Sequence, residues 1–387
     1  FLEEYMRALV DQEVVQYRSG RWRFAAGDAR RIPVPASIEA VLRQRLAGIG
    51  RERMRLLFAI SCFPEGVSLP IVQALLGPGE TLYDGLDSLE RRGLLVRTPG
   101  PTFRFAHGWT REQVYRRIPL RRRRRIHEAI ARTLIDASLG DWRGRPEEVA
   151  WHLLRGPTPE DALDSLLASG ARARAAHQNA RAASLFDQAL GLLKRNEGPR
   201  KRAVLENLAV LYGLMGDTDR AVRAYRQLLG MARSDHDPGE VARTCRKLAE
   251  VLASKGEHDE ADGWLGRALA ALPTGKASSL AGKASMLEED AAERARILQQ
   301  SAWSQVQRGR YQDGIRTCEE ALALCGDSDQ QAGPASDERT KAAVLNVLGT
   351  AEFSMGDFTP AFDHLEQSLA IREKADNLQG VAGSLLN

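Results

Sequence analysis

Two Gly-Lys pairs are the residues of this sequence that come nearest to nucleotide chemistry. Gly275-Lys276-Ala277 and Gly282-Lys283-Ala284 lack the first glycine of a phosphate-binding GxxxxGK(S/T) loop and the hydroxyl group that follows its lysine. Asp357-Phe358 continues with Thr359, so it is a turn rather than the Asp-Phe-Gly of a protein kinase. No Ser/His/Asp or Cys/His set has a spacing that supports catalysis. We therefore predict that this chain is not an enzyme and holds no catalytic or cofactor-binding residue.

Composition gives no sign of a metal site or of a membrane protein. The four cysteines form no CxxC pair and no Cys/His cluster with zinc spacing, which predicts small hydrophobic residues of a reducing cytoplasm; they are Cys62, Cys245, Cys318 and Cys325. No apolar run approaches the ~20 residues that cross a membrane, and no signal peptide is visible. The net charge of +4 is too small for a general attraction to nucleic acid. We expect a cytoplasmic protein without a metal ion.

Arg121–Arg125 is the densest run of charge in the chain, and Arg116 and Arg117 precede it. Such a run could contact nucleic acid or an acidic membrane surface. The interpretation that we favour is the solvated face of a helix whose other face buries apolar residues: Ile118, Leu120, Ile126, Ile130 and Leu134. His107 could be a sensor or a ligand, but we expect a packed and hydrogen-bonded residue.

The second half of the chain repeats a helical hairpin. In each copy a small residue lies in a first helix, a Gly-polar turn follows, and a second small residue lies in the next helix. The pairs are Ala209 with Ala221, Ala249 with Ala261, Ala302 with Gly314, and Gly349 with Ala361. An earlier copy around Ala182 lacks the Gly-Asp turn. Glycine adopts the left-handed turn conformation at low cost, and small residues let paired helices cross closely. These copies resemble the tetratricopeptide repeat, although their spacing of 39 to 53 residues exceeds the usual 34, which indicates longer helices or linkers at 273–284 and 326–337.

Extended inner surfaces of helical-repeat proteins commonly hold peptides or partner domains. The helical register places five side chains of the first helices on this concave side: Arg243, Arg246, Gln299, Trp303 and Asn346. We predict that these residues bind a protein or peptide. The alternative is that they only face the solvent.

The residue pattern in the first half of the chain predicts three helices followed by a β-hairpin, which is the order of a winged-helix domain. The apolar periodicity gives helices at 51–62, 69–76 and 81–92, and Pro99-Gly100 turns a hairpin within 93–105. A DNA-binding winged helix would place its third helix in the major groove. That helix is acidic here, with Glu80, Asp84, Asp87 and Glu90, and phosphate would repel it. We therefore do not expect nucleic acid as a partner of this helix.

Several segments resemble the bacterial signal-transduction ATPases of the STAND class, over nearly the whole chain. They are Phe1-Leu-Glu-Glu-Tyr5, the stretch 32–46 that begins Ile-Pro-Val-Pro, Phe103-Arg-Phe-Ala-His107, the stretch 111–115 and the stretch 121–131. In that class a nucleotide-binding domain precedes a winged helix and tetratricopeptide repeats, and a serine/threonine kinase, cyclase or transcription-regulator domain often occupies one end. Trp109 stands where the family usually has a smaller aliphatic residue, which puts the local packing there in question.

The resemblance implies a mainly all-α chain with four parts: the end of a nucleotide-binding module at 1–48, a winged-helix domain with a trailing helix at 49–140, a connector at 141–160, and about five repeats with a truncated sixth at 161–387. We expect a piece of a longer signalling ATPase that begins and ends within helices. Its repeats would sense a protein or ligand, and its winged helix would couple to the missing nucleotide-binding domain, where ATP and Mg²⁺ would bind. The alternatives are a DNA-binding transcriptional activator that uses the winged helix and Arg121–Arg125, and a plain tetratricopeptide scaffold.

Overall fold

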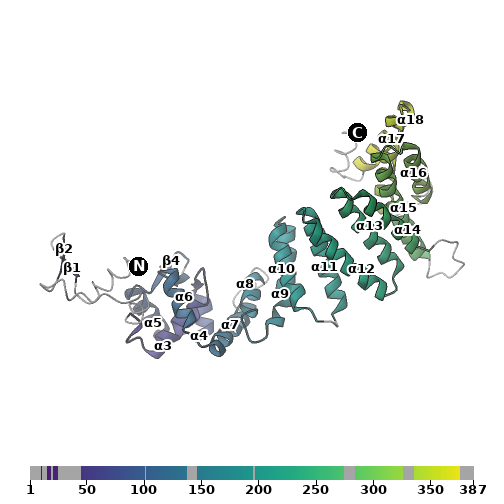
Figure 1. Ribbon diagram of the computed structural model, residues 1–387. Helices are drawn as coiled ribbons and strands as arrows, with labels where there is room; N and C mark the ends of the chain where they lie inside the picture. Colours follow the sequence, from purple (N-terminus) through teal and green to yellow (C-terminus); the bar gives the residue numbers. More distant parts are fainter. Residues whose placement is uncertain are drawn as a thin grey trace. The chain divides into compact units, whose positions relative to one another are not determined.

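The computed structural model describes the chain in two compact units, Phe1–Ala168 and Ser169–Asn387. The described residues are 10, 15–18, 21–24, 45–100, 102–136, 146–194, 197–273, 284–325 and 335–374. The helix predicted from Phe1 and the truncated sixth repeat lie outside these ranges, except for Val10, which is helical. Both units consist mainly of helices (Figure 1). Within the described residues, no helix is both long enough and apolar enough to cross a membrane.

Three helices and a small antiparallel sheet form the centre of unit 1, in the predicted order. The helices are α3 (Arg51–Ser61), α4 (Leu69–Leu76) and α5 (Glu80–Arg91), and β4 (Leu95–Thr98) and β5 (Thr102–Phe105) form the hairpin. The structure adds a short strand, β3 (Val67–Ser68), which pairs with β5 and gives the order β3-β5-β4. A second hairpin that the sequence analysis did not predict joins β1 (Val15–Arg18) to β2 (Arg21–Phe24).

The core of unit 1 forms where the predicted apolar faces meet the sheet. Leu57 and Ile60 of α3, Leu89 of α5, Leu95 of β4 and Phe103 of β5 are all at most 2% exposed. The opposite face of α5 keeps its acidic side chains in solvent, where Arg97 of β4 pairs with Asp87 and Glu90. Amphipathic periodicity therefore accounts for both the core and the charged exterior of this unit.

Three further helices follow the sheet: α6 (Gly108–Arg116), α7 (Leu120–Ile135) and α8 (Pro146–Leu153). His107 is half-buried at the N-cap position of α6. The prediction that Leu120 is buried is wrong, because α7 begins at this residue and its side chain is 58% exposed. Ile118, Ile130 and Leu134 are buried as predicted, and Ile126 is half-buried. The stretch predicted as a connector contains α8, whose side chains at Val149 and Ala150 are fully packed.

A buried pair of histidines joins α7 to α8. His127 and His152 are at most 1% exposed, and their Nδ1 atoms lie 2.9 Å apart in a hydrogen bond. The Oη of Tyr115 in α6 bonds to the Nε2 of His127, also at 2.9 Å. Burial, together with nearby arginines, lowers the pKa of His127 to about 4, and burial and His127 lower the pKa of His152 to about 2. Both imidazoles are therefore neutral in the folded protein near pH 7.

Five helical hairpins are described from the end of unit 1 through unit 2 (Figure 1). They follow a short 3-10 helix, η4 (Pro159–Ala162). The first hairpin is α9 (Leu163–Ala175) with α10 (Asn179–Leu192), and the second is α11 (Gly198–Leu214) with α12 (Thr218–Ser234). The third is α13 (Pro238–Ser254) with α14 (His258–Ala271). The last two are α15 (Ala284–Gln307) with α16 (Tyr311–Cys325), and α17 (Ala335–Met355) with α18 (Phe358–Lys374).

The predicted glycine turns are confirmed. Gly216, Gly256, Gly309 and Gly356 have φ angles of +74° to +92°. The N–H of the residue after the glycine donates a hydrogen bond to a carbonyl oxygen of the preceding helix, as from Asp217 N to Tyr212 O at 2.9 Å. His177 takes the same left-handed conformation in the copy that lacks a glycine, with φ +56°. The predicted longer helices are also present, since α15 has 24 residues and α17 has 21, against 17 in α11.

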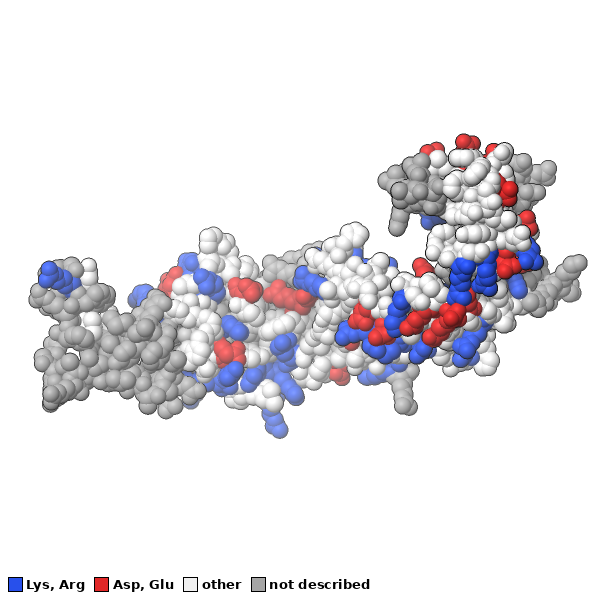
Figure 2. All heavy atoms as spheres, turned by 45° about the horizontal axis from the view of Figure 1, so that its top comes forward, with Lys and Arg blue, Asp and Glu red and all other residues white. Residues whose placement is uncertain are grey.

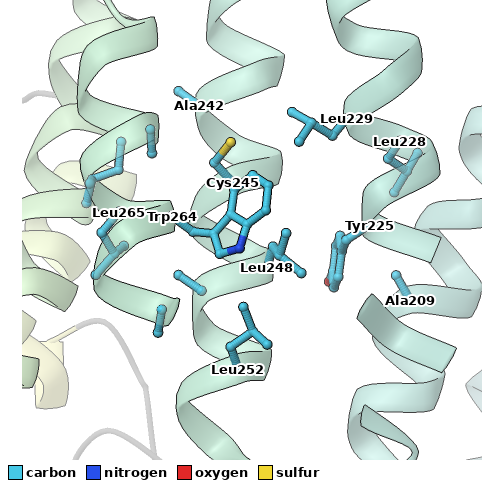
Figure 3. Close-up of a cluster of buried hydrophobic side chains, with 14 of the residues drawn as sticks. Ala209, Tyr225, Leu228, Leu229, Ala242, Cys245, Leu248, Leu252, Trp264 and Leu265 are labelled. Atoms are coloured by element: carbon cyan, nitrogen blue, oxygen red, sulfur yellow. The ribbon is translucent and has the colours of Figure 1, made fainter. Parts of the chain in front are cut away.

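The small residues lie where the helices of a hairpin cross. Ala209, Ala221, Ala302 and Ala361 are fully buried. A Cβ atom added to Gly349 would lie only 2.9 Å from the carbonyl oxygen of Ala361, so that position requires glycine. Within each hairpin, larger side chains complete the core around these small residues. Figure 3 shows the indole of Trp264 in α14 packed beside Cys245 and Leu248 of α13.

The histidine pair predicts a loss of stability in mild acid. The pKa of both groups is lower in the folded chain than its ordinary value near 6.5, so the unfolded chain binds more protons as the pH falls below 6.5. We expect the free energy of unfolding of unit 1 to fall by roughly 2–4 kcal/mol between pH 7 and pH 5, as measured by urea denaturation.

Two variants serve as controls for this measurement. His127→Gln/His152→Gln should be less stable at pH 7 and should lose most of the pH dependence. His258→Gln, which changes an exposed histidine of α14, should retain it. An unaltered pH dependence in the double variant would contradict the assignment.

Candidate functional site

A polar hollow of unit 2 lies along the first helices of the last three hairpins. Helix α15 packs against both α13 and α17. Residues of α15 that are three, four or seven positions apart share one face of the helix. Arg296, Gln299, Gln300 and Trp303 lie on this face and are half-buried or exposed. The hollow has a volume of about 460 Å³, and it is lined by Arg246, Arg296, Gln299, Gln300, Arg339, Thr340 and Ala343. We call it the repeat groove.

A buried carboxylate holds the arginines of the repeat groove in place. The side chain of Glu293 in α15 is 4% exposed, and its two oxygens accept hydrogen bonds from two different helices. Arg246 of α13 donates through Nε at 2.6 Å, and Arg296 of α15 donates through Nη1 at 3.1 Å. Charge-assisted bonds of this kind are stronger than neutral ones. Glu293 therefore ties α13 to α15 and fixes two guanidinium groups beside the groove.

The charged side chains around the repeat groove and Glu293 have an excess of positive charge. Arg246 and Arg296 share a single glutamate, Glu293, and Arg339 adds a third guanidinium group to the lining, so these four side chains carry a net charge of +2. Arg339 lines the groove from α17 and is exposed. Guanidinium groups present paired donors that match a carboxylate. The groove is thus suited to an anionic group.

Two amide oxygens of the same region are buried without a donor. Neither Oε1 of Gln300 nor Oδ1 of Asn346 accepts a hydrogen bond from the described residues. Gln300 lines the groove, and Asn346 lies one turn beyond Ala343 on the same face of α17. A buried acceptor without a donor costs about 1–3 kcal/mol, so a ligand that supplies N–H groups to these oxygens would gain affinity.

The other end of this face is acidic. Asp290 precedes Glu293 by one turn of α15, and its Oδ1 and that of Asp237 each lie 3.5 Å from the position that a Cβ atom of Gly239 would occupy. Burial, Asp237 and Glu289 raise the pKa of Asp290 above its usual range. Figure 2 shows acidic and basic side chains close together on the repeats. Along α15 the order is therefore acid, arginine, amide and then Trp303.

The structure brings together part of the predicted partner-binding set. Arg246 and Gln299 line the groove, and Trp303 and Asn346 lie one turn further along the same faces of α15 and α17. Arg243 does not line it, because it lies one turn earlier on α13 and pairs with Glu240 at 3.1 Å. The role of all five in binding stays a prediction.

The sequence analysis missed Glu293, Arg296, Gln300 and Arg339. The helical register could have identified Arg296, three positions before Gln299, and Arg339, seven positions before Asn346. Glu293 gives no such signal, because a glutamate among so many charged residues looks solvent-exposed until its partner on α13 is known.

The described part of the chain includes all four cysteines of the sequence. In it, no group of three His, Cys, Asp or Glu side chains could hold a metal ion. Cys62, Cys245 and Cys318 are buried, as expected for small hydrophobic residues, and Cys325 is half-buried. Burial raises the pKa of the Cys62 and Cys318 thiols to about 12, so they remain protonated and unreactive near neutral pH.

Comparison with known proteins identifies the kind of repeat. Models of the tetratricopeptide repeat match residues 204–239 and 342–375, which cover α11 with α12 and α17 with α18. Together with the five hairpins, these matches define a mainly all-α chain that contains a tetratricopeptide-type solenoid. No curated protein matches this sequence.

Several solved structures resemble the chain at low identity. BtubC from P. vanneervenii is 19% identical, with a TM-score of 0.43 over 60% of this chain and 88% of that one. A signal transduction ATPase (STAND) protein with a tetratricopeptide repeat sensor, from Pyrococcus horikoshii, is 15% identical, with a TM-score of 0.42 over 89% of this chain. This chain covers 54% of that protein's length. The apo form of the quorum sensor NprR from B. thuringiensis is 12% identical, with a TM-score of 0.45 over 90% and 81% of the two chains.

The ion pairs of Glu293 predict a specific loss of stability. Glu293→Gln removes the carboxylate and leaves two guanidinium groups uncompensated, which should lower the free energy of unfolding by about 3 kcal/mol, as for other buried ion pairs. Glu240→Gln is the matched control, because its partner Arg243 is 44% exposed and such pairs contribute less than about 1 kcal/mol. Equal losses in the two variants, measured by thermal denaturation, would contradict a special role for Glu293.

Proposed function

We propose that the repeat groove binds an extended acidic segment of a protein partner. The observation that carries this proposal is the positive hollow itself, in which Arg246 and Arg296 are fixed by Glu293 and Arg339 stands opposite on α17. A ligand carboxylate, from an Asp or Glu side chain or from a chain terminus, would be held by the paired donors of these arginines. The protein is accordingly an interaction module, and its output depends on what the groove captures.

The buried amides favour a peptide over a small anion. A peptide in an extended conformation offers N–H groups at regular intervals, and the oxygens of Gln300 and Asn346 require such donors. A free carboxylate or phosphate has none to give. The exposed indole of Trp303, one turn beyond Gln300, adds a flat apolar surface for a side chain of the ligand.

The charges along α15 also give the ligand a direction. The acidic group at Asp237 and Asp290 would attract a basic residue, and the arginines would attract an acidic one. We expect a bound segment to carry both charges, separated by a few residues, with the acidic side chain toward Trp303.

We further propose that this module is the sensing arm of a larger bacterial signalling ATPase. The segments that resemble the STAND class support this proposal, and so does the order of three helices and a hairpin before the repeats. In such an ATPase, the region 51–105 acts as a winged helix that couples the repeats to a nucleotide-binding domain. A kinase or transcription-regulator domain supplies the output. Ligand capture would shift the equilibrium between two states, which requires a different affinity for each state.

The two alternative functions differ in what they require of the chain. A plain tetratricopeptide scaffold uses the same repeat groove without the ATPase. A transcriptional activator that reads DNA through the third helix is disfavoured, because α5 exposes Asp84 and Asp87 and its Arg97 neighbour is already paired with Asp87 and Glu90.

Peptide selection tests the proposed groove directly. We expect random 12-residue peptides selected on the whole chain to be enriched in Asp and Glu. Arg339→Glu should then lower the affinity for a selected fluorescent peptide at least tenfold in a polarisation assay, since one charge-assisted bond is worth about 1.5–3 kcal/mol. Arg316→Glu is the matched control, because Arg316 is exposed on the second helix α16, and it should change the affinity less than about twofold.

Two results would overturn this proposal. One is a set of selected peptides with no acidic preference. The other is a loss of affinity that is the same in Arg316→Glu and Arg339→Glu, because that would reflect net charge rather than a site.

A further inference from the structure

A second hollow, in unit 1, concentrates arginines where two helices begin. The first turns of α3 and α7 line a space of about 940 Å³. Five of its lining residues are arginines, and one is acidic: Arg51, Arg55, Arg121, Arg122, Arg125 and Glu52. We call it the arginine hollow. Figure 2 shows basic side chains gathered along the lower edge of this unit.

Most of this charge is not neutralised by the described residues. Arg55 pairs with Glu52 at 3.2 Å, and that pair is exposed. Among the described side chains, none forms an ion pair with Arg51, Arg121 or Arg125. Five positive groups against one negative group leave a net charge of +4 around one space. Like charges this close repel one another, so the arrangement gains stability from an anion that neutralises them.

The arginines of the run do not all play the same part. Arg123 is half-buried, lies over the ring of Tyr115 at 4.7 Å and donates to the carbonyl of Ile118, so it belongs to the packing of unit 1. Arg122 stacks on Phe58 of α3 at 5.1 Å, which orients its guanidinium at the hollow. Arg124 is exposed and does not line the hollow. The run is therefore more than the solvated face of a helix.

The backbone adds to the positive charge of the hollow. Gly50 and Pro119 are the N-caps of α3 and α7, and neither helix has a side-chain cap. The first turn of α7 contains no acidic residue, although acidic residues are favoured there. These helix ends supplement the guanidinium groups, whose clustering around one open hollow is the primary observation.

We propose that the arginine hollow binds a compact polyphosphate group. Each phosphate offers oxygens that match the paired donors of a guanidinium, and a chain of phosphates places several negative charges within the small volume available. The hollow has the size of a small-ligand site, in contrast to the extended surface that duplex DNA requires. The source is either free inorganic polyphosphate or the triphosphate of a nucleotide.

Titration calorimetry of the whole chain with sodium tripolyphosphate tests the proposal. We expect saturable binding of one equivalent in 50 mM salt, weakened at 300 mM salt. Arg121→Gln/Arg125→Gln should weaken it at least tenfold. Arg104→Gln/Arg124→Gln changes the net charge equally at exposed positions outside the hollow, and it should change the affinity less than twofold.

Adding ATP without Mg²⁺ distinguishes the two sources. Equal affinities for ATP and tripolyphosphate support recognition of the phosphate chain alone, and a tighter ATP complex supports a nucleotide as the source. No binding of tripolyphosphate at low salt would overturn the proposal. An equal loss of affinity in both double variants would also overturn it, and so would tighter binding of a 12-base-pair duplex, which would assign the arginines to a nucleic-acid surface.

Discussion

Glu293 places a carboxylate that is only 4% exposed between guanidinium groups of two helices, and the surface of the last three hairpins depends on this contact. Without it, Arg246 and Arg296 would repel each other where α13 and α15 meet. With it, both arginines are held in fixed positions and still leave an excess of positive charge in the repeat groove. The same ion pairs thus stabilise the packing of two repeats and prepare the surface for an anionic ligand.

The features that could be predicted from the sequence are local ones. Gly216 and Gly356 mark turns because the required backbone angle is a property of one residue, and Ala209 and Ala361 mark helix crossings because only small side chains fit there. The hairpin of β4 and β5 was likewise predicted from Pro99-Gly100. In these cases a short stretch of chain contains the whole physical reason for the structure.

The features that escaped prediction arise from contacts between distant segments. Glu293 and Arg246 are 47 residues apart, and the irregular spacing of the repeats gave no period from which to align α13 with α15. The pairing of His127 with His152 joins two helices across 25 residues. Leu120 was misplaced for a different reason, since the periodic pattern did not show that α7 begins there. The ion pairs of the repeat groove therefore became visible only with the fold, although two of its lining residues, Arg246 and Gln299, were predicted.

The two hollows suit two different kinds of anionic ligand. In the repeat groove, arginines alternate with a carboxylate and with amide oxygens that need donors, which favours a peptide. In the arginine hollow, guanidinium groups dominate and suit a phosphate chain. The central claim, that α13, α15 and α17 form the ligand surface, is tested most directly by hydrogen–deuterium exchange with and without a selected acidic peptide. Slower exchange confined to these three helices is the predicted result, and protection centred on α14, α16 and α18 would contradict it.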